Sequence, residues 1–154
     1  MNSTPKQNLQ NLKITLPIAS NPVANYVNYV QTGNLLYLSG KGPLQNDNTH
    51  ITGKLGKDLD VEQGYEAARL TAIAHISVLN DVLEDLSRVK QIVKVFGMVN
   101  CVDDFYDQPE VINGYSDLMV AVFGDKGKHA RSAVGINVLP RNIAVEIEVI
   151  VEIE

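Results

Sequence analysis

Residues 143–153 read IAVEIEVIVEI, the clearest structural pattern in the chain. The near-perfect period of two predicts a β-strand with a buried face and an open face. The face expected to meet the core consists of Ile143, Val145, Ile147, Val149 and Val151. The other face carries Ala144, Glu146, Glu148, Ile150 and Glu152. A strand with one continuous apolar face needs a second layer to cover it, and helices are the expected cover.

Four more strands are predicted outward from this one. Residues 26–32 (YVNYVQT) and 35–39 (LLYLS) flank Gly33-Asn34, a pair that tolerates positive φ and favours a two-residue hairpin loop. Residues 89–101 are rich in β-branched side chains, and residues 132–139 alternate before a turn at 140–142.

Two helices are predicted between these strands. Residues 61–86 have apolar side chains at helical spacing after a capping residue at Asp60, and residues 110–123 repeat the pattern before Gly124. The order β-β-α-β-α-β-β indicates an α+β fold, with a mixed β-sheet and two helices packed on one face. No second helical layer is available for the other face, so that face is expected to be solvated or to pack on another subunit.

The N-terminal residues are treated separately. Residues 1–21 are predicted to be an extension, frayed up to about residue 11 and with a possible edge strand over 12–16, where apolar and polar residues alternate before Pro17. Residues 22–154 are predicted to form a single domain.

Composition excludes several classes of protein. The chain has 154 residues, a formal net charge of −5 and one Cys. One Cys allows no intrachain disulfide and no cysteine zinc cluster, and the acidic balance argues against a nucleic-acid partner. No segment has the apolar core of a signal peptide or the length of a membrane helix. We therefore expect a cytoplasmic protein without a membrane partner and without a metal site.

Arg131 and Glu146 are the two candidate chemical groups. An Arg at the entrance of a strand can present a planar fork to a carboxylate, but it can equally be a surface residue or pair with an Asp or Glu of the chain. A Glu among apolar strand residues can act as a base with a raised pKa if it is covered, but on a solvated face it is ordinary. Ser39-Gly40 offers a hydroxyl and a close backbone approach, or only turn chemistry.

The three histidines, at positions 50, 75 and 129, do not form a recognisable Ser-His-Asp set. His75 falls inside the first predicted helix and is interpreted as a core or surface histidine. Cys101 is interpreted as a small buried side chain.

Several motifs together resemble the RidA/YjgF family. Residues 129–148 (HARSAVGINVLPRNIAVEIE) are similar to its C-terminal signature, Leu38-Ser39-Gly40 with Pro43 to its SGxxP pattern, and Tyr26 and Asn113 to its hairpin Tyr and helix Asn. The match spans roughly residues 22–154. The resemblance implies a chorismate-mutase-like fold and a homotrimer with inter-subunit clefts for small carboxylate ligands. It also implies hydrolysis of 2-iminobutanoate, 2-iminopropanoate and their enamines to 2-keto acids and ammonia, with no cofactor.

The resemblance also assigns roles to individual residues. Arg131 would hold the substrate carboxylate, and Glu146 would orient or deprotonate the attacking water. The substrate-binding set is Tyr26, Ser39, Gly40, Asn113, Ser132 and Ala133. Ala133 stands where well-studied members carry Cys, so a thiol mechanism is excluded at that position.

Two alternatives to the deaminase stay open. The first is a non-catalytic protein that binds small carboxylates or 2-keto acids, for which Arg131 would suffice. The second is a ribonuclease, against which the charge of −5 and the lack of a His pair argue. The extra length, in the N-terminal extension and the 44–60 loop, has no assigned role.

Overall fold

The alternating C-terminal stretch forms the central strand of a five-stranded sheet. The computed structural model describes residues 3–154. The strands are β1 (Tyr29–Thr32), β2 (Leu35–Lys41), β3 (Val89–Asn100), β4 (Ala130–Ile136) and β5 (Val145–Ile153). Their order across the sheet is β1-β2-β5-β3-β4, with β3 and β4 parallel and all other neighbours antiparallel. The predicted mixed sheet is confirmed.

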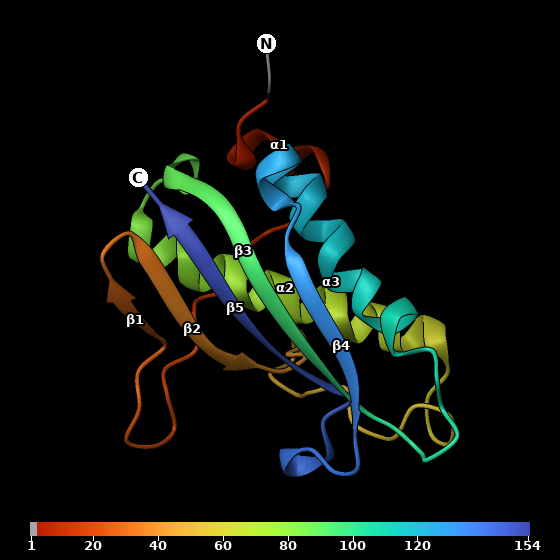
Figure 1. Ribbon diagram of the computed structural model, residues 1–154. Coiled ribbons are helices and arrows are strands. Elements are labelled where there is room, and N and C mark those ends of the chain that lie inside the picture. The colour runs from red at the N-terminus through yellow and green to blue at the C-terminus, as the bar shows by residue number, and fades with distance from the viewer. Residues whose placement is uncertain (1–2) are drawn as a thin grey trace.

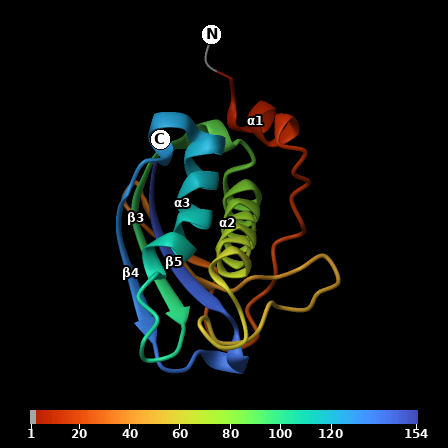
Figure 2. The same cartoon turned by 90° about the vertical axis from the view of Figure 1, so that its right-hand side faces the viewer.

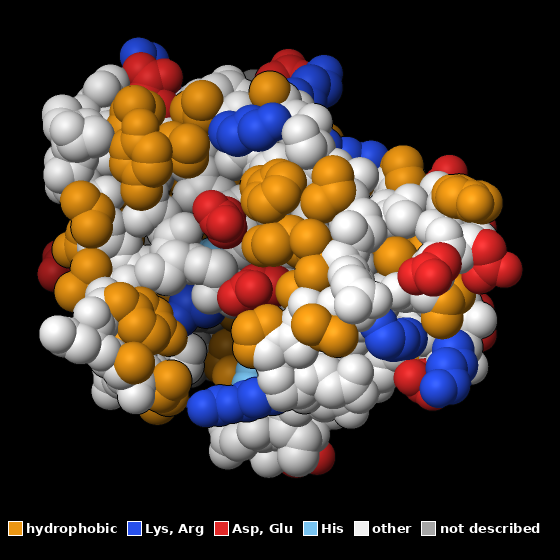
Figure 3. Space-filling model, turned by 60° about the horizontal axis from the view of Figure 1, so that its bottom comes forward, with side chains coloured by type: hydrophobic (Ala, Val, Ile, Leu, Met, Phe, Trp, Pro, Cys, Tyr) orange, Lys and Arg blue, Asp and Glu red, His pale blue; other side chains and the backbone are white. Residues whose placement is uncertain are grey.

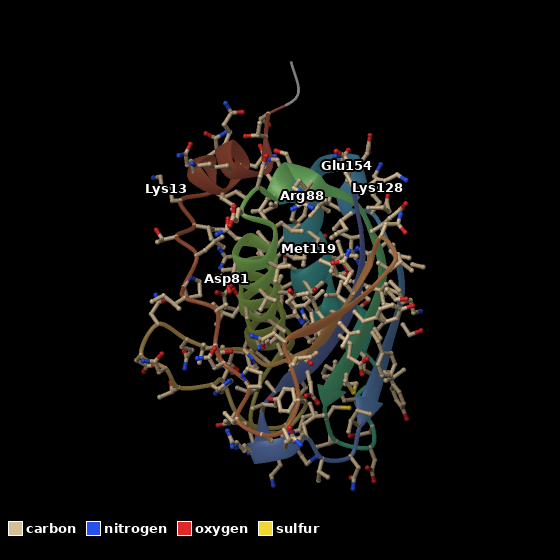
Figure 4. All side chains as sticks on the ribbon, turned by 90° about the vertical axis from the view of Figure 1, so that its left-hand side faces the viewer. Lys13, Asp81, Arg88, Met119, Lys128 and Glu154 are labelled. Atoms are coloured by element: carbon tan, nitrogen blue, oxygen red, sulfur yellow. The ribbon has the colours of Figure 1, made fainter. Side chains whose placement is uncertain are left out.

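Two long helices, α2 (Val61–Leu83) and α3 (Gln108–Phe123), cover one face of this sheet. Figure 1 looks onto the uncovered face, and Figure 2 shows both helices on the same side of the strands. The predicted core face of the C-terminal strand, from Ile143 to Val151 at every second position, is buried, although the strand itself begins at Val145. Met119 of α3, labelled in Figure 4, is fully buried in this layer.

Local sequence sets the start and the packing of α2. The Asp60 side chain accepts from the backbone N–H of Gln63, whose own side chain accepts from the backbone N–H of Asp60, so the first turn is capped on both sides. The helix then passes very close to α3. A Cβ built on Gly114 would lie 2.0 Å from the backbone oxygen of Tyr65, so only glycine permits this approach.

The hairpin prediction is confirmed at its turn and corrected at its start. Thr32 pairs with Leu35 across Gly33 and Asn34, and Gly33 has a φ of 58°. However, β1 begins at Tyr29, so Tyr26 lies in the loop that precedes it. The strand predicted over 132–139 begins earlier, at Ala130, because its parallel pairing with β3 starts there.

The prediction for the N-terminal residues is wrong in two respects. Residues 12–16 form no strand, and the segment from Pro5 to Asn11, predicted to be frayed, forms helix α1. Thr4 and Gln7 cap this helix reciprocally, Leu9 is buried, and Asn8 Nδ2 donates to the Val122 carbonyl at the end of α3 over 2.8 Å. A local cap and tertiary contacts therefore stabilise this helix together. The division into an extension and one domain stays a prediction.

The other face of the sheet is open and partly apolar. Val30, Tyr37 and Ile150 lie side by side across β1, β2 and β5, and Val30 and Tyr37 are 58% and 44% exposed.

In the described part of the chain no helix has the length and apolar character needed to cross a membrane.

Candidate active site

Strand β2 carries a β-bulge at Ser39-Gly40, where the sequence placed a candidate site. Leu38 pairs with Val149 and Lys41 with Ile147, so β2 has one residue more than β5 between these two pairs. Bulges redirect backbone groups and often lie next to binding sites.

Ser39 is held at three points. Its N–H donates to the Asn28 carbonyl over 2.9 Å, its hydroxyl donates to the Val27 carbonyl over 2.6 Å, and its own carbonyl lies 3.0 Å from Nε2 of His75. The proton of the Ser39 hydroxyl is thus used in a hydrogen bond to the loop before β1.

The Glu146 carboxylate rests against this bulge. A Cβ built on Gly40 would lie 2.9 Å from Glu146 Oε1, so the missing side chain makes room for the carboxylate. Glu146 is half-buried, and burial, followed by the negative charge of Glu148, raises its pKa above the ordinary value for Glu. A carboxylate with a raised pKa accepts a proton more readily, which suits a general base.

Glu146 opens into a cleft of about 700 Å³ at the β1–β2 side of the molecule. Figure 3 shows acidic and basic side chains around a hollow on this side. The cleft residues that carry polar or charged groups are Ser20, Asn21, Tyr26, Ser39, Lys41, His50, Arg141, Glu146 and Glu148. Four predicted site residues therefore share one cleft, namely Tyr26, Ser39, Gly40 and Glu146.

Two cations line the same cleft and were not predicted as site residues. Lys41 donates from Nζ to Asn28 Oδ1 over 2.7 Å, and burial lowers its pKa. Arg141, predicted only as a turn residue, has a φ of 55°, an uncommon conformation for a residue with a side chain. Neither forms an ion pair with a carboxylate of residues 3–154.

Arg131 lies at the opposite edge of the sheet, on β4, and points towards α3. Its Nη1 donates to Asn113 Oδ1 over 2.9 Å and to Ser116 Oγ over 3.1 Å, and its Nη2 donates to the Pro109 carbonyl over 3.3 Å. All three acceptors are neutral, and no Asp or Glu in the described chain forms an ion pair with Arg131. The guanidinium is held in place, yet its charge is not neutralised.

His129 orients the Ser116 hydroxyl that accepts from Arg131. Its Nδ1 lies 2.6 Å from the Gly127 carbonyl and its Nε2 lies 2.9 Å from Ser116 Oγ. A carbonyl only accepts, so Nδ1 carries the proton and Nε2 accepts from the Ser116 hydroxyl. Ser116 then accepts from Arg131 and donates to His129. Burial is the main cause that lowers the pKa of His129, so it is neutral near pH 7.

Within one chain, Arg131 and Glu146 do not face a common space. Arg131 lies opposite Val95, whose side chain is in the core, whereas Glu146 lies opposite Met98 on the other face of β3. They are two strands and three residues apart, which separates their Cα atoms by about 14 Å. The sequence motif contains both residues but could not show that they lie on opposite faces of the sheet.

The three remaining predicted residues lie outside the Glu146 cleft, on β4 or on the neighbouring helix α3. Asn113 supports Arg131 directly. Ser132 lies on the open face and accepts from Lys94 Nζ over 3.3 Å, and Ala133 packs against the core.

Cys101 is buried. No group of three potential metal ligands occurs within residues 3–154.

Comparison with known proteins gives a consistent picture. The family model described as "YjgF/chorismate mutase-like" matches residues 7–153, and its description also carries the word endoribonuclease. Protein TCP17 of Trypanosoma cruzi is 45% identical over 147 residues, which cover 95% of this chain and 92% of that protein.

A second relative has an activity in its name. The 2-iminobutanoate/2-iminopropanoate deaminase of Dermatophagoides farinae is 32% identical over 142 residues, covering 92% of this chain and 95% of that protein. Among solved structures, the protein Atu1372 of Agrobacterium tumefaciens has a TM-score of 0.91 and 42% identity, covering 97% of this chain and 92% of that one.

Proposed function

The chain belongs to the RidA/YjgF, chorismate-mutase-like family, and from that premise we propose that it hydrolyses reactive 2-imino acids. Water adds to the imine carbon to give a carbinolamine, which expels ammonia and leaves a 2-keto acid; an enamine first tautomerises to the imine. The imine carbon is already electrophilic, so the protein has to hold the carboxylate and place the water. Clearing such reactive metabolites would be a form of metabolite damage control.

The observation that carries the proposal is the state of Arg131. Three neutral acceptors hold its guanidinium, and no carboxylate of residues 3–154 neutralises it. The Nε–H and one Nη2–H take no part in these bonds, so the guanidinium keeps donors for a carboxylate. Arg131 is the group we expect to bind the substrate carboxylate.

Glu146 supplies the second half of the chemistry. Its raised pKa supports a role as the base that takes a proton from the attacking water. On this basis the rate should fall as Glu146 becomes protonated on the acid side of the pH profile.

We place the two halves together in a homotrimer. In each inter-subunit cleft, the β4 edge of one copy would bring Arg131 to the Glu146 cleft of the next copy. The partly apolar open face of the sheet, which includes Val30 and Tyr37, supports an interface between copies. Light scattering should give a mass near three times 16.9 kDa, whereas a stable monomer would contradict the shared site.

The activity is tested by ammonia release from 2-iminobutanoate made in situ by an amino-acid oxidase. Wild type should accelerate release, and Arg131→Ala should lose roughly a hundredfold or more, because orientation of the substrate is lost. Arg69→Ala is the matched control, since Arg69 pairs with Glu66 on the surface of α2. Equal rates for wild type and Arg131→Ala would refute the role of Arg131.

The shared site has a separate test by mixing variants. Arg131→Ala and Glu146→Gln homotrimers should each be inactive. Trimers co-assembled from equal amounts of both chains should regain about a quarter of the sites, because one interface in four then combines an intact Arg131 with an intact Glu146. No recovery in mixed trimers would show that the site lies within one copy.

Two other functions are separated by the same samples. A carboxylate-binding protein without activity would bind 2-ketobutyrate in calorimetry and release no ammonia. Ribonuclease activity, which the family description also suggests, is disfavoured by the net charge of −5, and an RNA-cleavage assay on Arg131→Ala tests it. The cytoplasmic location stays a prediction.

A further inference from the structure

His75 is a fully buried histidine bonded on both ring nitrogens, and the proposed chemistry does not use it. It lies on α2 with 0% exposure. Its Nδ1 is 2.9 Å from the hydroxyl of Tyr115, also fully buried, and its Nε2 is 3.0 Å from the Ser39 carbonyl. Two hydrogen bonds therefore link Tyr115 of α3, through His75 of α2, to the β2 bulge.

The chemistry of the partners fixes each proton. The Ser39 carbonyl only accepts, so Nε2 of His75 carries the proton and Nδ1 must accept. Burial raises the pKa of Tyr115 well above its ordinary value, so its hydroxyl keeps the proton and donates it to Nδ1. Burial is also the main cause that lowers the pKa of His75 to about 4, and the ring is therefore neutral near pH 7.

The bond to His75 sets the direction of the Ser39–Gly40 peptide. The described chain has no cis peptide bonds, so the Ser39 carbonyl and the Gly40 N–H point in opposite directions. The carbonyl points to α2, on the helix side of the sheet. The Gly40 N–H therefore points away from α2, and the Glu146 carboxylate lies against the same residue, in the space that a Cβ on Gly40 would fill.

We infer that His75 is a positioning residue, which holds the Ser39–Gly40 peptide so that the Gly40 N–H is a backbone donor beside the Glu146 carboxylate. Tyr115 fixes the tautomer that His75 needs for this. The inference rests on the proposed function for its effect on catalysis, but the direction of the peptide is independent of it.

Helix α3 is connected both to the β2 bulge and to Arg131. Tyr115 reaches the bulge through His75, while Asn113 and Ser116 of the same helix hold Arg131. One helix thereby contacts Arg131 directly and the bulge beside Glu146 through His75.

The experiment compares four variants. His75→Leu removes both hydrogen bonds, whereas His75→Gln keeps a donor for Ser39 and an acceptor for Tyr115. Tyr115→Phe removes only the hydroxyl. Thr71→Val is the control, because Thr71 is equally buried on α2 and its hydroxyl bonds within the helix, to the Ala67 carbonyl.

Each variant is measured in two ways, by steady-state ammonia release and by NMR of the histidine ring nitrogens and the Gly40 amide. We expect His75→Leu to lower kcat by roughly tenfold to a hundredfold with little change in KM, since small displacements at a site have effects of this size. His75→Gln should recover most of the loss, Tyr115→Phe should lie in between, and Thr71→Val should match wild type.

The NMR readout separates failure of this inference from failure of the proposed function. Wild type should show the Nε2–H tautomer, and the Gly40 amide signal should move in His75→Leu but not in Thr71→Val. An Nδ1–H tautomer, an unmoved Gly40 signal or an unchanged kcat in His75→Leu would overturn the inference. If wild type released no ammonia but the Gly40 signal moved as expected, the positioning would stand and the deaminase proposal would fall.

Discussion

Acid should destabilise this protein through His75 in particular. The pKa of the buried ring is lowered from 6.5 to about 4, first by burial and then by the charge of Lys41, while the bond to the Ser39 carbonyl acts in the opposite direction. In the unfolded chain the ring titrates near its ordinary value. Between these two pKa values the unfolded state therefore binds a proton that the folded state does not.

The sign and size of the effect follow directly. The contribution of His75 to stability is intact above pH 6.5, decreases as the pH falls, and levels off below about pH 4. A difference of about 2.5 pKa units corresponds to roughly 3 kcal/mol, and His75 is fully buried, so solvent does not screen it. Other groups titrate in the same range, so the effect has to be isolated by a variant.

The assay is urea unfolding of wild type and His75→Gln at several pH values, with the protomer concentration held constant because the proposed assembly depends on it. The difference in unfolding free energy between the two proteins should shift by roughly 3 kcal/mol against wild type between about pH 7 and about pH 4. Thr71→Val should track wild type throughout. A difference that does not change with pH would show that His75 titrates alike in both states, and the argument from its burial would fail.

Three further predictions concern single substitutions. Gly114→Ala should cost about 3 kcal/mol of stability in urea unfolding, because its Cβ would lie 2.0 Å from the Tyr65 backbone oxygen; an unchanged midpoint would contradict the close helix contact. Gly40→Ala should lower kcat at least roughly tenfold by displacing the Glu146 carboxylate, and full ammonia release would argue against that contact. Asn113→Ala should raise KM by roughly tenfold through loss of a hydrogen bond to a charged group, whereas a fall in kcat alone would point to another role.

Much of the fold follows from pattern, and the exceptions have physical causes. The strict alternation over 143–153 predicted β5 because its register places every second side chain in the core. The same alternation over 12–16 predicted a strand wrongly, because five residues without a neighbouring strand to pair with make no sheet. Helix α1 carries a local signal that the prediction missed, the cap between Thr4 and Gln7, whereas the burial of Leu9 and the contact with α3 are not visible in any local pattern.

The candidate site could likewise be predicted only in part from the sequence. The alternation over 143–153 placed Glu146 on the open face, but the face on which Arg131 lies follows only from the parallel register of β4 on β3. His75 and Tyr115 are 40 residues apart on different helices, so their bond was invisible before the helices were packed. Lys41 and Arg141 each lie within a motif in which only other residues are predicted to belong to the site.

The wide separation of Arg131 and Glu146 has a consequence for the newly made chain. On the proposed assembly, an isolated copy carries an anion receptor at the β4 edge and a base in the cleft on the β1–β2 side, and neither alone can complete a turnover. Activity would then increase more steeply than linearly with protein concentration at high dilution, and it would decay after a concentrated stock is diluted into assay buffer, as the copies separate. The fold would thus act as a concentration threshold, silent in the monomer and active only once enough chains are present.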